Sequence, residues 1–84
     1  MANAIPTGLI DKNRKPVYTG QVVRMNYTEN VIEGIVRVRG YRYRNRLFCV
    51  ETKEKIRYPF ELMKKPSKQI EVIKDYSYAK DRLD

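Results

Sequence analysis

Apolar and polar residues alternate along most of this chain in short runs, which is the pattern of half-buried β-strands. The clearest run is Val22–Tyr27, where Val23, Met25 and Tyr27 share one face and the intervening residues share the other. After a short apolar entry at Gly8–Ile10, further short runs, apolar or alternating, are separated by turn-forming residues: they cover Val17–Tyr18, Val31–Arg39, Leu47–Val50, Ile56–Tyr58 and Gln69–Ile73. The pattern therefore predicts five or six short strands and no long amphipathic helix.

Short strands with turns at intervals of roughly eight to twelve residues are typical of a small all-β barrel or sandwich. We expect a barrel, because closure removes the exposed strand edges that a small sheet covers poorly. Ser77 is placed to cap a short closing helical turn over Tyr78–Leu83. At 84 residues the chain makes one domain. We place this domain at residues 8–84, after a flexible arm over residues 1–7.

Gly40 interrupts the strand pattern where apolar and charged residues would otherwise mix on one face. A β-bulge at this glycine shifts the alternation by one residue. The two tyrosines that follow then continue the valine face, and the arginines line the opposite face: Val36, Val38, Tyr41 and Tyr43 on one side, and Arg37, Arg39, Arg42 and Arg44 on the other. A tight turn centred on Gly40 is the alternative interpretation.

The positive charge of the chain is the main indication of its function. The chain has a formal net charge of +8, and its densest basic stretch contains no acid: Arg37, Arg39, Arg42, Arg44 and Arg46. The planar guanidinium of arginine pairs well with phosphate and carboxylate. Alternate residues on a strand face lie roughly 7 Å apart, about the separation of successive phosphates on a single strand. The stretch therefore predicts an anionic partner, and a merely solvated strand face is the alternative.

Two further groups of residues belong to this hypothesis. Lysines in a later loop form a second basic patch: Lys64, Lys65 and Lys68. Tyr41 and Tyr43 stack on bases if they are exposed, and belong to the core if the bulge turns them inward. The hypothesis requires that the guanidinium groups on both sides of Gly40 project together into solvent, without being neutralised by the chain's own carboxylates.

The usual catalytic residues are nearly absent. The chain has no histidine, which excludes Ser-His-Asp and Cys-His chemistry and His-ligated zinc. Cys49 is the one cysteine; it lies in an apolar run, and we interpret it as a buried structural thiol. We therefore predict a protein that is not an enzyme and that has no cofactor and no metal site.

No segment of the sequence predicts a membrane anchor. The longest apolar runs span about four residues, against the roughly 20 needed to cross a bilayer. The N-terminal residues lack the charged start and apolar stretch of a signal peptide. We expect a soluble cytoplasmic protein with no membrane partner.

Two segments resemble a known family. Gly8–Val23 reads GLIDKNRKPVYTGQVV, and Ile70–Ile73 reads IEVI with Tyr76 and Tyr78 shortly after it. These segments resemble the opening signature, G-L-x-D-K-N-G-K-x-I-Y-x-G-D-x-V, and the closing E-V-I-G-N-I-Y segment of the YopX-like proteins of phages and prophages. The matches occur in the correct order and cover about a third of the chain.

The sequence also departs from the family pattern. Arg14 stands where the family has glycine, so either Asn13 alone takes the left-handed turn position or the turn type differs. Gln21 replaces an aspartate, and Lys74-Asp75 replaces Gly-Asn. The resemblance implies an SH3-like β-barrel of phage or prophage origin that acts in the cytoplasm of a bacterial host. It implies no activity, because the family has no established biochemical role.

Three hypotheses on function follow. The first is a nucleic-acid-binding module, which we rank highest. The second is a protein-docking inhibitor of a host or anti-phage defence protein that is itself acidic or binds nucleic acid. The third is a sponge for a phosphorylated nucleotide, which requires a concave pocket lined by the arginines. A homo-oligomer is compatible with all three, because a thin core often leaves apolar strand surface to share.

Overall fold

The protein is built mainly from antiparallel strands, in a computed structural model that describes residues 4–42 and 45–74. The strands are β1 (Pro6–Ile10), β2 (Pro16–Tyr18), β3 (Val22–Tyr27), β4 (Asn30–Arg42), β5 (Asn45–Glu51), β6 (Arg57–Pro59) and β7 (Ile70–Lys74). A 3-10 turn, η1 (Phe60–Leu62), and a four-residue helix, α1 (Pro66–Gln69), lie between β6 and β7. The prediction of an all-β protein is confirmed.

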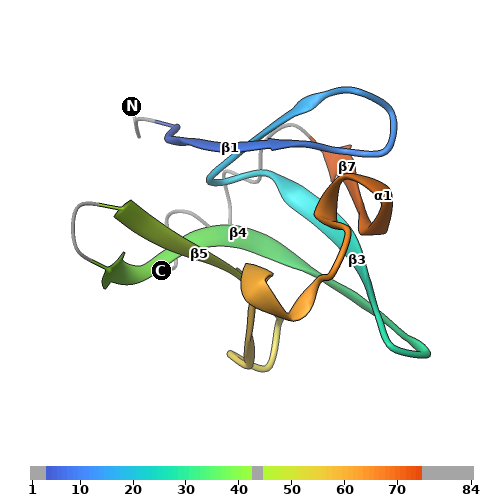
Figure 1. Ribbon diagram of the computed structural model, residues 1–84. Coiled ribbons are helices and arrows are strands. Elements are labelled where there is room, and N and C mark those ends of the chain that lie inside the picture. Colours follow the sequence, from blue (N-terminus) through green and yellow to red (C-terminus); the bar gives the residue numbers. More distant parts are fainter. Residues whose placement is uncertain (1–3, 43–44, 75–84) are drawn as a thin grey trace.

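The described strands form one five-stranded sheet and one separate hairpin. The large sheet has the order β6-β5-β4-β3-β7, and β1 pairs only with β2. Among the described residues the pairing does not close into a barrel, so the expected closure is not observed. The two edge strands of the large sheet, β6 and β7, are joined by the segment 60–69, which therefore passes from one edge of the sheet to the other (Figure 1).

The hydrophobic core lies on one face of the large sheet, which we call the inner face. The β1–β2 hairpin and the segment 60–69 cover this face and contribute to the same cluster of buried side chains: Val17, Val23, Met25, Ile32, Val36, Phe48, Val50, Phe60, Met63, Ile70 and Val72. Strand alternation places Ile35 and Cys49 on the opposite, outer face, where both are also buried. Each strand thus contributes to the core through every second residue, as the sequence pattern predicts.

β4 organises the sheet because it is long enough to have different partners at its two ends. Its first half pairs with β3, from Tyr27 opposite Asn30 to Val22 opposite Ile35. Its second half pairs with β5. Figure 1 shows β4 running along the length of the molecule, with the β3–β4 turn at one end and the paired ends of β4 and β5 at the other. Surfaces at the two ends of β4 are therefore well separated.

A buried carboxylate fastens the β1–β2 hairpin to β7. Asp11 is only 2% exposed, and its Oδ1 accepts hydrogen bonds from the backbone N–H groups of Asn13 (2.9 Å) and Lys15 (2.7 Å). Its Oδ2 accepts one from the backbone N–H of Val72 (2.9 Å). Asp11 therefore closes the predicted turn and links it to the last described strand.

The same turn resolves the question raised by Arg14. Arg14 itself takes the left-handed conformation, with φ of 65°, and its N–H donates to the carbonyl oxygen of Asp11. Asn13 does not have a positive φ. The interpretation in which Asn13 alone takes the left-handed position is wrong, and the turn keeps its glycine-like geometry with an arginine in place.

Most predicted strand boundaries agree with the structure to within a few residues, and Val22–Tyr27 agrees at both ends. β1 begins at Pro6, inside the expected arm, because Ile5 exchanges hydrogen bonds with Thr19 and packs against the core. The basic loop at Lys64–Lys68 includes the start of α1. The helical turn predicted over Tyr78–Leu83 lies outside the described residues.

Candidate anion-binding surfaces

The β-bulge predicted at Gly40 is present. Val38 lies opposite Phe48 and Gly40 lies opposite Leu47, so Arg39 is the extra residue on β4. After the bulge, Tyr41 lies opposite Arg46, which shares the inner face with Phe48 and Val50 by alternation along β5. Tyr41 therefore continues the face of the preceding valines, and the alternative of a tight turn at Gly40 is wrong.

The bulge does not bring the described arginines into one row, because two of them turn toward different carboxylates. On the outer face, Nε of Arg37 lies 3.2 Å from Oε1 of Glu51, and the two side chains are 23% and 11% exposed. Nη2 of Arg39 lies 2.6 Å from Oε2 of Glu61 in η1. The two arginines thus pair with carboxylates from different elements, Glu51 at the end of β5 and Glu61 in η1.

The paired ends of β4 and β5 extend beyond the core. Tyr41 is 69% exposed although it lies on the inner face, so the expectation that the bulge would bury it is wrong. Arg46 is also exposed, beside a shallow groove of about 300 Å³ that Phe48 and Phe60 help to line. The side chain of Arg42 and the whole of Tyr43 and Arg44 lie outside the described residues. A common cationic face is therefore not formed by the three described arginines, Arg37, Arg39 and Arg46.

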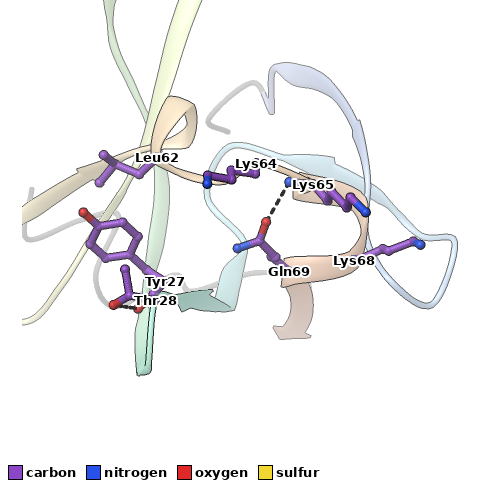
Figure 2. A pocket seen from close by; sticks show the side chains of 7 residues that line it. All are labelled: Tyr27, Thr28, Leu62, Lys64, Lys65, Lys68 and Gln69. Carbon is purple, nitrogen blue, oxygen red and sulfur yellow. Dashed lines mark hydrogen bonds between the residues drawn. The ribbon is translucent and has the colours of Figure 1, made fainter.

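The predicted lysine patch does come together, around a groove at the other end of β4. The groove has a volume of about 530 Å³ and is lined by Tyr27, Thr28, Leu62, Lys64, Lys65, Lys68 and Gln69. Tyr27 is the last residue of β3 and Thr28 follows it in the β3–β4 turn, and the other residues come from the segment that crosses the inner face. We call it the lysine groove; Figure 2 shows Tyr27 and Leu62 on one side and α1 on the other.

Local packing explains why these lysines face outward. Met63 and Ile70 are buried in the core, and they hold both ends of the intervening segment against the sheet. Pro66 occupies the first turn of α1, where a missing N–H costs nothing. The side chain of Gln69 accepts a hydrogen bond from the backbone N–H of Lys65 (2.7 Å) and donates one to the backbone carbonyl of Asn26 (2.9 Å). Gln69 thus holds the residue that precedes α1 and ties the helix to β3.

The three lysines keep their charges available to a ligand. All three are exposed, and none forms an ion pair within the part of the chain that the structure describes. The nearest acids along the chain are already paired with other residues: Glu61 with Arg39, and Glu71 with Lys12 and Arg24. Figure 2 shows Lys64 extending toward Leu62 and Tyr27, whereas Lys65 and Lys68 extend away from Tyr27. The positive charge is therefore spread along the groove and does not converge on one point.

The sequence did not identify Tyr27 as a residue that lines this groove. Tyr27 continues the alternation of Val23 and Met25, which indicates a core residue, and its ring does contact Tyr58 at a centroid distance of 6.3 Å. It is nevertheless only half-buried, because it lies at the end of β3 where the core stops. Its place next to the turn at Thr28 is the one signal in the sequence that hints at a partly open ring.

The cysteine and the acidic side chains that the structure describes form no further candidate site. Cys49 is fully buried, as predicted, and burial raises the pKa of its thiol despite the opposing charge of Arg57. Within residues 4–42 and 45–74, no three acidic or cysteine side chains lie close enough together to hold a metal ion. Asp11, the buried acid, is committed to three backbone N–H groups.

Comparison with protein families, with characterised proteins and with solved structures finds no match to this chain. None of the helices that the structure describes is long and apolar enough to span a membrane.

Proposed function

We propose that this protein is a small, non-enzymatic module that binds nucleic acid through the lysine groove. The observation that carries the proposal is three exposed ammonium groups without internal ion pairs, placed along one groove beside an aromatic ring. Lysine is a good phosphate binder through its point charge, and basic grooves with aromatic side chains are the usual means of holding nucleic-acid strands.

The arginines of β4 and β5 contribute less to nucleic-acid binding than the sequence alone predicts. Arg37 and Arg39 already have carboxylate partners, so a phosphate would have to compete with Glu51 and Glu61. Arg46 lies at the opposite end of β4 from the lysine groove. We therefore assign the primary contact to Lys64, Lys65 and Lys68, with Arg46 at most an outlying contact.

The spread of the lysines favours a polymer over a free nucleotide. A single phosphate is bound most tightly where several cationic groups converge on it, whereas these ammonium groups point to different ends of the groove (Figure 2). A chain of phosphates meets them in succession. A nucleotide sponge therefore has less support than a nucleic-acid-binding module.

We further propose that the domain is an SH3-like variant of the YopX-like family, of phage or prophage origin, acting in the host cytoplasm. The segment 60–69 supports this proposal, because it carries a 3-10 turn and joins strands at opposite edges of one sheet, like the interrupted last strand of an SH3-like barrel. The GLIDKNRKP segment, which Asp11 fastens to β7, is the second support.

Fluorescence anisotropy with a labelled 12-nucleotide strand tests the nucleic-acid proposal. Three phosphate contacts give a slope of log K against log salt of about −2, so affinity should fall about 20-fold between 50 and 200 mM salt. The double variant Lys64→Gln/Lys68→Gln should reduce the slope to about −0.7. The charge-matched variant Lys53→Gln/Lys74→Gln, at exposed lysines outside the groove, should leave the slope unchanged.

Equal slopes for the two double variants, or no binding at 50 mM salt, would refute the proposal. The alternative of a protein-docking inhibitor is separated by affinity purification from host cells with and without nuclease. A host protein that stays bound after nuclease treatment favours docking, and one released by nuclease favours a nucleic-acid bridge.

A further inference from the structure

We infer that the lysine groove selects single-stranded over duplex nucleic acid and holds an unpaired base against Tyr27 without reading its identity. This inference rests on the proposed function, and it names the class of nucleic acid that the same groove takes.

The groove offers space and an apolar wall for one ring. Its volume of about 530 Å³ lies within the range of pockets that bind small molecules. Tyr27 and Leu62 line one side of it, and Leu62 is 37% exposed. A base in a duplex is stacked on both faces and presents only its edges in the grooves. Only an unpaired base can therefore place a face against this wall.

The orientation of the Tyr27 ring is fixed by its neighbour. The rings of Tyr27 and Tyr58 are tilted by 59° with their centroids 6.3 Å apart, and both residues pack against the core cluster. Stacking on a ring that is already held in place loses little side-chain entropy on binding. The Tyr27 ring therefore needs little reorientation when a base binds.

Two polar side chains beside the Tyr27 ring, those of Gln69 and Thr28, already have hydrogen-bond partners within the protein. The amide oxygen of Gln69 accepts from Lys65 and its amide nitrogen donates to Asn26. The hydroxyl of Thr28 donates to the backbone carbonyl of Tyr27 (2.5 Å). Discrimination between bases needs free donors and acceptors in a fixed pattern. Stacking makes no such demand, because every base has a π-face.

The lysines complete the arrangement by holding the backbone. Lys64 extends toward the Tyr27 side, where the phosphate next to a stacked base would lie, and Lys65 and Lys68 extend toward the other end (Figure 2). Phosphates on both sides of the base thus meet ammonium groups. Phosphate contacts of this kind give affinity and position but carry no sequence information.

The test measures the anisotropy of four labelled probes at one salt concentration: 12-mers of dT and of dA, a 12-base-pair duplex, and a 12-mer without bases. We expect both single strands to bind at least tenfold more tightly than the duplex, and to lie within about threefold of each other. Tyr27→Leu should weaken binding of the dT strand by about 5- to 150-fold, the range for loss of one stacked base. It should not change binding of the base-free strand.

Matched variants separate stacking from folding. Tyr41→Leu removes an exposed tyrosine at the opposite end of β4 and should leave all four affinities unchanged. Tyr27→Phe keeps the ring and should bind like the unmodified protein. Should Tyr27→Leu fail to fold, the uncharged variant Leu62→Gln at the partly exposed wall provides the second test and should weaken binding of the single strands but not of the base-free strand.

The outcomes separate a failure of this inference from a failure of the proposed function. If Lys64→Gln/Lys68→Gln weakens binding but the duplex binds as well as the single strands, or if Tyr27→Leu has no effect, the proposed function stands and the present inference is overturned. A preference of more than tenfold between dT and dA overturns the absence of base reading. If the lysine variant has no effect either, the proposed function itself fails.

Discussion

Asp11 is a buried carboxylate with three backbone hydrogen-bond partners, and replacing it with alanine tests the role of the β1–β2 hairpin. Its carboxylate accepts three backbone hydrogen bonds between 2.7 and 2.9 Å, and one of them comes from Val72 on β7. Asp11→Ala removes all three acceptors at once. The hairpin then loses the Asp11–Val72 link to β7, whereas the hydrogen bond from the N–H of Lys12 to the carbonyl of Ile70 and the Lys12–Glu71 ion pair remain.

The expected loss of stability follows from the burial of each donor. The N–H of Val72 is buried, and leaving such a group unsatisfied costs about 1–3 kcal/mol. The N–H groups of Asn13 and Lys15 are partly accessible, so water can replace the carboxylate at a cost of about 0.5–1.5 kcal/mol each. The total is about 4 kcal/mol, a large part of the roughly 4–13 kcal/mol expected for a domain of this size.

Thermal unfolding followed by circular dichroism measures this effect. A loss of about 4 kcal/mol should lower Tm by about 15–30 °C in a domain of this size. Asp11→Asn keeps one acceptor oxygen and should lie between the alanine variant and the unmodified protein. Glu54→Ala removes an equal charge from an exposed position and is the control. Equal Tm values for Asp11→Ala and Glu54→Ala would refute this account of the hairpin.

The same carboxylate should make stability depend on pH. Burial acts to raise the pKa of Asp11, but the hydrogen bonds from Val72, Lys15 and Asn13 and the charge of Lys15 outweigh it, and the net pKa is lowered. A lowered pKa contributes stability that is present above the ordinary carboxyl value and lost as pH falls below about 4 toward the folded-state value. The unmodified protein should therefore lose more unfolding free energy than Asp11→Asn between about pH 5 and 2.

Three further predictions concern single positions. Arg14→Gly should raise the unfolding free energy by about 0.5–1 kcal/mol in urea titration, because φ of 65° strains an L-residue; a decrease would contradict this. Gly34→Ala should destabilise by about 1–3 kcal/mol or more, because a Cβ there overlaps a backbone carbonyl of β5, whereas Gly40→Ala meets open space and should change stability by less than about 0.5 kcal/mol. Cys49 should react with a thiol reagent far more slowly in the folded protein than in denaturant; equal rates would contradict its burial.

The strands and their faces were predictable because they depend on local information. Val23 and Met25 alternate with polar neighbours on β3, and the side-chain period of a strand is two whatever its partners are. The bulge at Gly40 was predictable for the same reason, since only a shift of phase keeps Val38 and Tyr41 on one face. The structure shows no requirement for glycine at that position, because Gly40 has neither a positive φ nor a close neighbour.

The ion-pair partner of each arginine could not be predicted from the sequence. Arg37 pairs with Glu51 because β5 returns alongside β4, and Arg39 pairs with Glu61 because η1 packs against β5. Neither partner is near its arginine in the sequence. The sequence of an arginine-rich strand therefore predicts a cationic face. Only the tertiary structure shows which carboxylates lie beside the arginines and neutralise them.

By itself the sequence determined an all-β domain, the inward residues of its strands, the phase shift at Gly40 and an excess of positive charge, because periodicity and composition act over a few neighbouring residues. Tertiary structure alone decided which of those charges remain available. The lysine groove exists because the segment 60–69 crosses the sheet and places Lys64 and Lys68 beside Tyr27, some forty positions earlier in the chain. Such a juxtaposition depends on long-range packing, which no local pattern encodes.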